Sequence, residues 1–169
     1  IEKPIYKEKI RIRSYKNTKD NNLIFVEMKR KFKGEVYKRR ITLEEDIAYD
    51  WITGKISNPN TDQISLEIDY FIDYYKKLQP VIFLSYDRVA YYGNENMNFR
   101  ITFDEEILCR DYDYTFEIEP SGIQLLPDEH ILMEVKTDGA LPIWLVNILS
   151  DLKIYKTSFS KYGNAYQKI

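Results

Sequence analysis

Polar and apolar residues alternate along the first forty residues with the period of two that is typical of half-buried β-strands. The segment 5–15 reads IYKEKIRIRSY, and the segment 23–32 reads LIFVEMKRKF. One side of the first segment holds Lys7, Lys9, Arg11 and Arg13, and one side of the second holds Glu27, Lys29 and Lys31. Lys33-Gly34 is typical of a hairpin turn, and EVYKRRI (35–41) predicts a third strand. Both sides of that third strand carry cations, so parity does not settle which side faces solvent.

The middle of the chain changes to helical spacing. Thr42 stands before two acids and is expected to cap a helix that stops at Gly54. A second helix is expected from Thr61 or Asp62 until Pro80. Further strands are expected at 81–92, 97–109 and 131–137, and further helices after Pro142 (143–152) and at 161–167. These segments predict an α+β domain built on a curved antiparallel sheet or β-barrel with packed helices.

Length and composition bound the answer. The 169 residues contain no Gly/Ser/Pro-rich linker, so a single domain over 1–169 is expected. Lys and Arg number 25 against 27 for Asp and Glu, and this balance predicts neither a nucleic-acid nor a membrane partner. The apolar runs are shorter than the ~20 residues of a membrane-spanning helix. The single Cys109 cannot form an internal disulfide, and a cytoplasmic location is expected.

Cations dominate the faces of the predicted strands, although the whole chain is nearly neutral. Like charges directly opposite each other in a sheet are unfavourable. Two unit charges ~8 Å apart repel by ~2 kcal/mol at an effective dielectric of ~20. The cations concerned are Lys9, Arg11, Arg13, Lys29, Lys31, Arg88 and Arg100. One interpretation is a solvated sheet face; the other, which we prefer, is a site for a polyanion, because Arg and Lys together can hold several phosphoryl groups.

Other kinds of site have weaker support. His130 is expected to be a loop or strand-edge residue rather than a base, and Cys109 a small core residue rather than a nucleophile. The sequence contains no P-loop, dinucleotide-binding glycine motif or H-E-x-x-H pair.

Glu27 and Glu134 each precede a Lys by two residues, so acid and cation share a strand face. Such a pair is either an ordinary surface ion pair, worth ~0–1 kcal/mol, or part of a divalent-metal site that bridges the acid to phosphate oxygens. We expect Glu134, and with it Glu27, to bind a metal ion.

Seven motifs in this order resemble the catalytic domain of the vacuolar transporter chaperone (VTC) family, the polyphosphate polymerases: KIRIRSY, FVEMKRK, VYKRRI, LSYDRVAYYG, NFRITFDEEI, ILMEVKTDG and FSKYGNAY. The resemblance covers nearly the whole chain. That family belongs to the triphosphate tunnel metalloenzymes. The resemblance therefore implies strands that close into a basic tunnel, acids that hold Mn²⁺ or Mg²⁺, and transfer of the ATP γ-phosphoryl group onto a growing polyphosphate chain.

The same motifs imply roles for individual residues. Arg11 and Arg13 resemble the arginines of the first basic strand, Glu134 the metal-binding glutamate, and Lys161 the lysine of the closing helix. The expected catalytic residues are Lys29, Arg88 and Arg100. The expected phosphate-binding residues are Lys9, Arg11, Arg13, Lys31, Lys38, Lys136 and Lys161. The expected metal ligands are Glu134 and Glu27.

ATP and polyphosphate are thus the expected partners, with no nucleic acid. The family domain has an upstream helix and strand that this chain is expected to lack, so the segment by itself can be inactive. Two alternatives stay open: a triphosphatase of the same fold, and a module that binds polyphosphate without turnover. A binding module does not need Glu134 or a metal.

Overall fold

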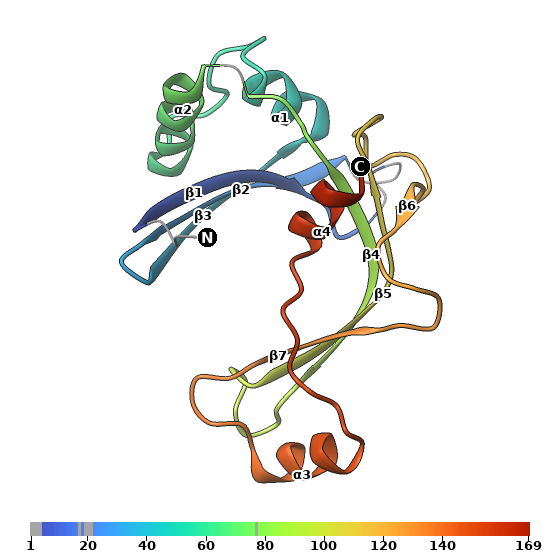
Figure 1. The fold of residues 1–169 in the computed structure, drawn as a ribbon. Helices are drawn as coiled ribbons and strands as arrows, with labels where there is room; N and C mark the ends of the chain where they lie inside the picture. The colour runs from blue at the N-terminus through green and yellow to red at the C-terminus, as the bar shows by residue number, and fades with distance from the viewer. Residues whose placement is uncertain (1–4, 17, 19–21, 77) are drawn as a thin grey trace. The chain divides into compact units, whose positions relative to one another are not determined.

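A computed structural model describes residues 5–16, 18, 22–76 and 78–169. The chain divides into two compact units, which we treat separately: unit 1 is Ile1–Pro80 with Thr115–Glu119, and unit 2 is Val81–Tyr114 with Pro120–Ile169. Each unit contains one antiparallel sheet with helices (Figure 1). The α+β class is confirmed. Within the described residues both sheets are open, so the barrel that the strand pattern suggested is not seen there.

Three strands form the sheet of unit 1 in the order β1-β2-β3: β1 (Tyr6–Arg13), β2 (Leu23–Phe32) and β3 (Glu35–Glu44). The hairpin between β2 and β3 turns at Lys33 and Gly34, whose φ values of 47° and 97° suit a tight two-residue turn. This hairpin was predicted correctly. The predicted N-cap at Thr42 was wrong, because β3 stays paired with β2 as far as Glu44.

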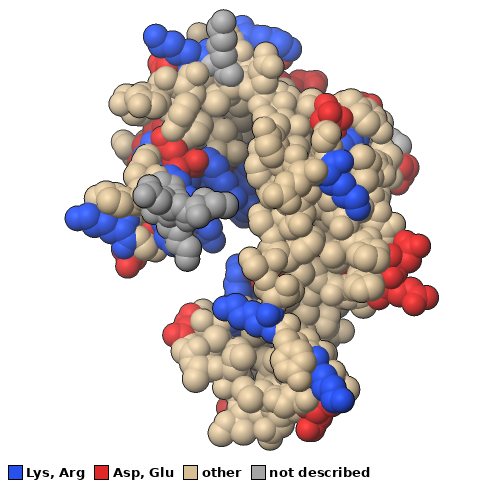
Figure 2. Space-filling view, in the orientation of Figure 1, with Lys and Arg blue, Asp and Glu red and all other residues tan. Residues whose placement is uncertain are grey.

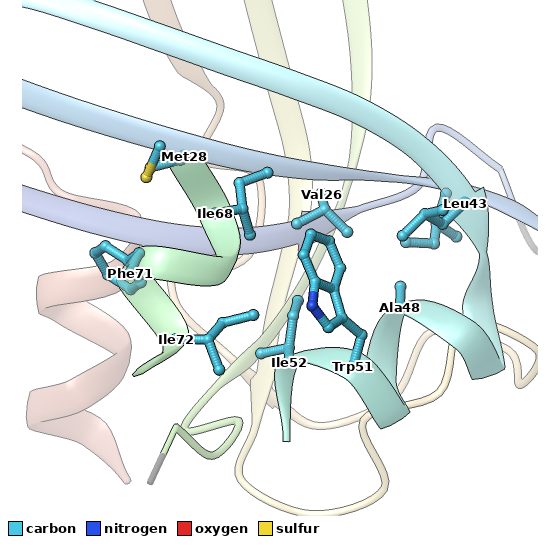
Figure 3. Close-up of a cluster of buried hydrophobic side chains, with 10 residues drawn as sticks. Val26, Met28, Leu43, Ala48, Trp51, Ile52, Ile68, Phe71 and Ile72 are labelled. Atoms are coloured by element: carbon cyan, nitrogen blue, oxygen red, sulfur yellow. The ribbon is translucent and has the colours of Figure 1, made fainter. Parts of the chain in front are cut away.

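Helices α1 (Glu45–Ile52) and α2 (Gln63–Tyr75) cover one face of this sheet. Asp62 caps α2 by accepting from the backbone N–H groups of Ile64 and Ser65, each at 3.0 Å, as expected. The core between helices and sheet is shown in Figure 3 and consists of Ile24, Val26, Met28, Leu43, Ala48, Trp51, Ile52, Ile68, Phe71 and Ile72. These side chains bury the apolar sides of the strands and leave the polar sides of β1 and β2 on the other face.

The buried Glu45 attaches a distant segment to unit 1. Its carboxylate accepts from Thr18 Oγ1 at 2.6 Å, Thr115 Oγ1 at 3.0 Å and the Phe116 N–H at 2.9 Å. Phe116 also packs against the core of this unit. These contacts explain why residues 115–119 belong with the first eighty residues.

In unit 2, β5 (Arg100–Arg110) is the central strand. β4 (Phe83–Tyr92) pairs with it, as do β7 (Leu132–Lys136) and the two-residue β6 (Ile123–Gln124), which the sequence did not reveal. α3 (Ile143–Asp151) begins after Pro142, and α4 (Lys161–Lys168) lies where the final helix was expected. Ser160 caps α4 by accepting from the backbone N–H of Gly163. In the described part of both units, no helix has the length and apolarity needed to cross a bilayer.

The core of unit 2 joins β5 to α4. It comprises Ile107, Cys109, Leu125 and Ala165. Cys109 is fully buried there, which confirms the prediction of a core residue, and burial raises the pKa of its thiol. A β-bulge in β5 includes Glu106, whose φ is 46°. The extra residue shifts the alternation of the strand, so that Asp104, Ile107 and Cys109 all point toward α4.

Candidate anion-binding site

The cross-strand register of unit 1 collects cations on the face opposite α1 and α2, which we call the basic face. It carries Lys7, Lys9, Arg11, Arg13, Phe25, Glu27, Lys29, Lys31, Val36, Lys38, Arg40 and Thr42. Eight of these are cationic and one is acidic. Lys and Arg side chains gather on this part of unit 1 in Figure 2. The side of β3 that parity left undecided is now known: Lys38 and Arg40 lie on the basic face.

Like charges lie directly opposite one another across the basic face. Lys7 pairs with Lys31, and Lys29 has Lys9 on one side and Lys38 on the other. Surrounding protein atoms, and then the charges of Arg11 and Lys29, lower the pKa of Lys9. The folded protein therefore disfavours the protonated ammonium of Lys9, and an anion bound beside it would reverse this effect.

Glu27, the acid of the basic face, is surrounded by arginines. Its carboxylate accepts from Arg11 Nε at 2.5 Å and Arg40 Nε at 2.9 Å, and Arg13 Nε lies 3.8 Å away. Burial by itself would raise the pKa of Glu27, but hydrogen bonds from Arg11 and Arg40, together with the charges of Arg11 and Arg13, hold the pKa below its usual value. Glu27 thus fixes the orientation of guanidinium groups on adjacent strands.

Arg40 and Tyr15 belong to this cluster although sequence reasoning assigned them no site role. The Arg40 guanidinium lies over the Phe25 ring at 4.5 Å from its centroid. The Tyr15 hydroxyl accepts from Arg13 at 3.3 Å and from Arg40 at 3.4 Å. The alternation of β3, which places Arg40 on the same side as Lys38, was the signal that could have identified Arg40.

The arginines on the helix side of the same sheet are matched by acids. Arg30 Nε lies 3.1 Å from Glu8 Oε2, and Arg39 Nε lies 3.2 Å from Glu67 Oε2. The imbalance of charge is therefore a property of the basic face and not of the sheet as a whole.

In unit 2, a second group of basic residues surrounds Asp104, which has no solvent exposure. Arg88 binds both of its carboxylate oxygens, from Nε at 2.5 Å and Nη2 at 2.7 Å, and Lys161 Nζ forms a further short ion pair with it. Both cations lie over the Tyr86 ring: Arg88 Cζ is 5.0 Å and Lys161 Nζ is 4.8 Å from the ring centroid. Burial would raise the pKa of Asp104, but the two cations lower it.

Arg100, Glu134 and Lys136 lie on the same face of this sheet as Asp104. The register pairs Arg100 with Lys136 and Thr102 with Glu134. Glu134 is half-exposed, and its carboxylate lies 3.9 Å from Arg88 and 3.8 Å from Lys136. The carboxylate of Glu134 is therefore farther from Arg88 and Lys136 than the carboxylate of Glu27 is from Arg11 and Arg40. The unit 2 residues expected from sequence therefore share one face, which Lys161 reaches from α4.

A comparison with protein-family models identifies the family of the chain. The model described as the VTC domain matches residues 1–169. The chain belongs to the VTC domain family. A search of curated proteins gave no match. The family expected from the seven motifs is thus confirmed.

The metal-binding role implied by the VTC resemblance fits one of the two expected glutamates. Among the described residues there is no group of three or more His, Cys, Asp or Glu side chains suited to a metal ion. Glu27 gives its oxygens to arginines, which does not suit a metal ligand. Glu134 can offer a carboxylate oxygen, and Mg²⁺ is often held by one carboxylate together with substrate phosphates.

The residues expected to converge in a VTC tunnel divide between the units. Arg11, Arg13 and Lys29 lie in unit 1; Arg88, Arg100 and Glu134 lie in unit 2. Within each unit they share one face, and their convergence on a common inner surface stays a prediction. His130 is an exposed loop residue whose Nδ1 lies 3.1 Å from the Asp128 carbonyl, as predicted.

Proposed function

We propose that this VTC domain is a polyphosphate polymerase that transfers the γ-phosphoryl group of ATP onto a growing polyphosphate chain. The observation that carries the proposal is the basic face of unit 1, where eight cations accompany one acid. A phosphate chain matches this surface because it presents many closely spaced negative charges. Lys contributes mobile point charges and Arg contributes a planar fork of donors.

In the proposed reaction, a terminal oxygen of the polyphosphate chain attacks the γ-phosphorus of ATP. One P–O bond forms there, the bond to the β–γ bridging oxygen breaks, and ADP leaves with that electron pair. The protein has no covalent step to perform, and its task is to align the phosphates and neutralise charge. We propose Lys29, Arg88 and Arg100 as catalytic residues, and Lys9, Arg11, Arg13, Lys31, Lys38, Lys136 and Lys161 as phosphate-binding residues.

Glu134 is the residue that we assign to a divalent cation, Mn²⁺ or Mg²⁺, which when bound would neutralise phosphate charge. Glu27 has a different role in this proposal, because its carboxylate orients Arg11 and Arg40. The closed tunnel implied by the family resemblance stays a prediction.

Product analysis of the natural full-length protein tests the proposal. Wild type incubated with ATP and Mn²⁺ should form polyphosphate and ADP. Glu134→Gln keeps the side-chain shape and removes its charge, so it should lose metal-dependent turnover and still bind polyphosphate. Release of inorganic phosphate without chains would identify a triphosphatase instead.

The second candidate is a module that binds polyphosphate without turnover. The hydrogen bonds of Glu27 with Arg11 and Arg40 favour this binding module. Of the two glutamates expected to bind a metal ion, they leave Glu134 alone, and a binding module needs no metal. A binding module would give no metal-dependent product from wild type, and Glu134→Gln would bind polyphosphate as well as or better than wild type.

A further inference from the structure

Asp104 is the fully buried acid at the centre of the basic group in unit 2. It lies directly opposite Arg88 in the β4–β5 register, which brings the two side chains together. Lys161 reaches it from the first residue of α4, and α4 is fixed to the sheet through the buried Ala165. One carboxylate therefore connects a strand residue and a helix residue that are far apart in the sequence.

The geometry leaves part of the Arg88 guanidinium available. An arginine side chain has five N–H donors, and Asp104 engages the edge formed by Nε and Nη2. The Arg88 side chain keeps 30% of its surface exposed, whereas Asp104 has none. Nη2 also lies 3.9 Å from a carboxylate oxygen of Glu134. The donors on Nη1 can therefore meet a ligand while the other edge stays fixed.

We propose that Asp104 is a positioning residue that presets Arg88 and Lys161 for a phosphoryl group. This inference rests on the proposed function for the identity of the ligand, a polyphosphate. Asp104 has no surface with which to touch that ligand and acts through the two cations. The Tyr86 ring, which contacts both of them, supports the same arrangement.

The inference predicts a result opposite in sign to that expected from charge alone. If only the total charge mattered, removing an acid from a cationic site would strengthen binding of an anion. If Asp104 positions the cations, removing its charge lets Arg88 and Lys161 repel each other and lose their shared orientation. Anion binding then weakens although the protein has become more positive.

Calorimetric titration of the full-length protein with inorganic triphosphate tests this point. Asp104→Asn should weaken binding about tenfold, the usual effect of losing a charged hydrogen-bond partner. Glu105→Gln is the matched control: it removes the same charge from the next, exposed residue of β5 and should leave the affinity unchanged. Unchanged or tighter binding by Asp104→Asn would overturn the inference.

An Arg88→Ala background separates positioning from general loosening of the fold. If Asp104 acts through Arg88, then Asp104→Asn should weaken triphosphate binding far less in Arg88→Ala than in wild type. Equal losses in both backgrounds would overturn the inference. If Asp104→Asn does not fold, Asp104→Glu keeps the charge and displaces the carboxylate, and wild-type affinity in that variant would likewise overturn it. Binding of triphosphate requires no turnover, so these results stand even if wild type makes no polyphosphate.

Discussion

Lys9 of β1 lies directly opposite Lys29 of β2 on the basic face, a pairing of like charges across neighbouring strands. Such pairs are normally avoided in sheets. The pKa of Lys9 is lowered first by partial burial and then by the charges of Arg11 and Lys29, so the pairing contributes to an environment that disfavours the protonated ammonium. A bound polyanion would remove this cost, which links the register of the sheet to its proposed ligand.

Lys9→Met should therefore change stability in a way that depends on phosphate. Without added phosphate the variant should unfold at the same temperature as wild type or higher, because a repelled cation has been removed. With inorganic triphosphate its unfolding temperature should rise less than that of wild type, because a ligand contact is gone. Thermal unfolding with and without triphosphate measures both effects. Lys55→Met, which removes an exposed cation paired with Asp50 in α1, should respond to triphosphate as wild type does; the same response from Lys9→Met would contradict the account.

Glu27→Gln should destabilise the protein by about 1–3 kcal/mol at neutral pH, because a buried acceptor of charged hydrogen bonds is weakened. The pKa of Glu27 is lower in the folded state than in the unfolded state. Its contribution is thus fully present above the unfolded pKa and is lost as pH falls through the folded pKa. The difference between wild type and variant should shrink over that acidic range in denaturant unfolding at a series of pH values. Glu35→Gln, at an exposed end of β3, should show neither effect; a pH-independent difference for Glu27→Gln would be contrary to this explanation.

Ile68→Ala should cost about 2–5 kcal/mol of unfolding free energy, since Ile68 is fully buried between α2 and the sheet. Leu66→Ala is its control on the same helix, where half of the side chain is exposed, and should change stability by about 0.5 kcal/mol or less. Urea unfolding gives both values. Equal costs would mean that α2 does not pack on the sheet as described.

Local alternation was enough to predict β1 and β2, because one side of each strand must face the core and the other must not. Thr42 shows where local signals fail. Thr42 is a residue type that commonly caps helices and stands before two acids, yet the pairing of Leu23 with Glu44 extends β3 beyond Thr42. A pairing between distant residues determined that boundary, and no short window of sequence contains it.

For the site, as for the fold, the sequence predicted features that depend on local alternation and missed those that depend on tertiary contacts. Parity placed Arg11 and Lys29 on a common face, but Arg39 and Arg40 could not be told apart until the helices were seen to pack on the Arg39 side. Asp104 belongs to the run of three acids at 104–106, and only the bulge and the packing of α4 distinguish the buried acid from its exposed neighbours. These features depend on tertiary contacts.

Binding of long-chain polyphosphate to Arg40→Gln and Arg39→Gln tests the central claim, that the basic face of β1–β2–β3 holds the phosphate chain. The two arginines are adjacent in β3, the side chains of Arg40 and Arg39 are 45% and 48% exposed, and each forms an ion pair with one glutamate. The substitutions remove a charge from opposite faces of the sheet, and Arg40→Gln also removes the contacts of Arg40 with Phe25 and Tyr15. Arg40→Gln should weaken binding about tenfold and reduce its dependence on salt, whereas Arg39→Gln should bind about as tightly as wild type. Equal affinities for the two variants, or a larger loss in Arg39→Gln, would contradict the assignment of the basic face.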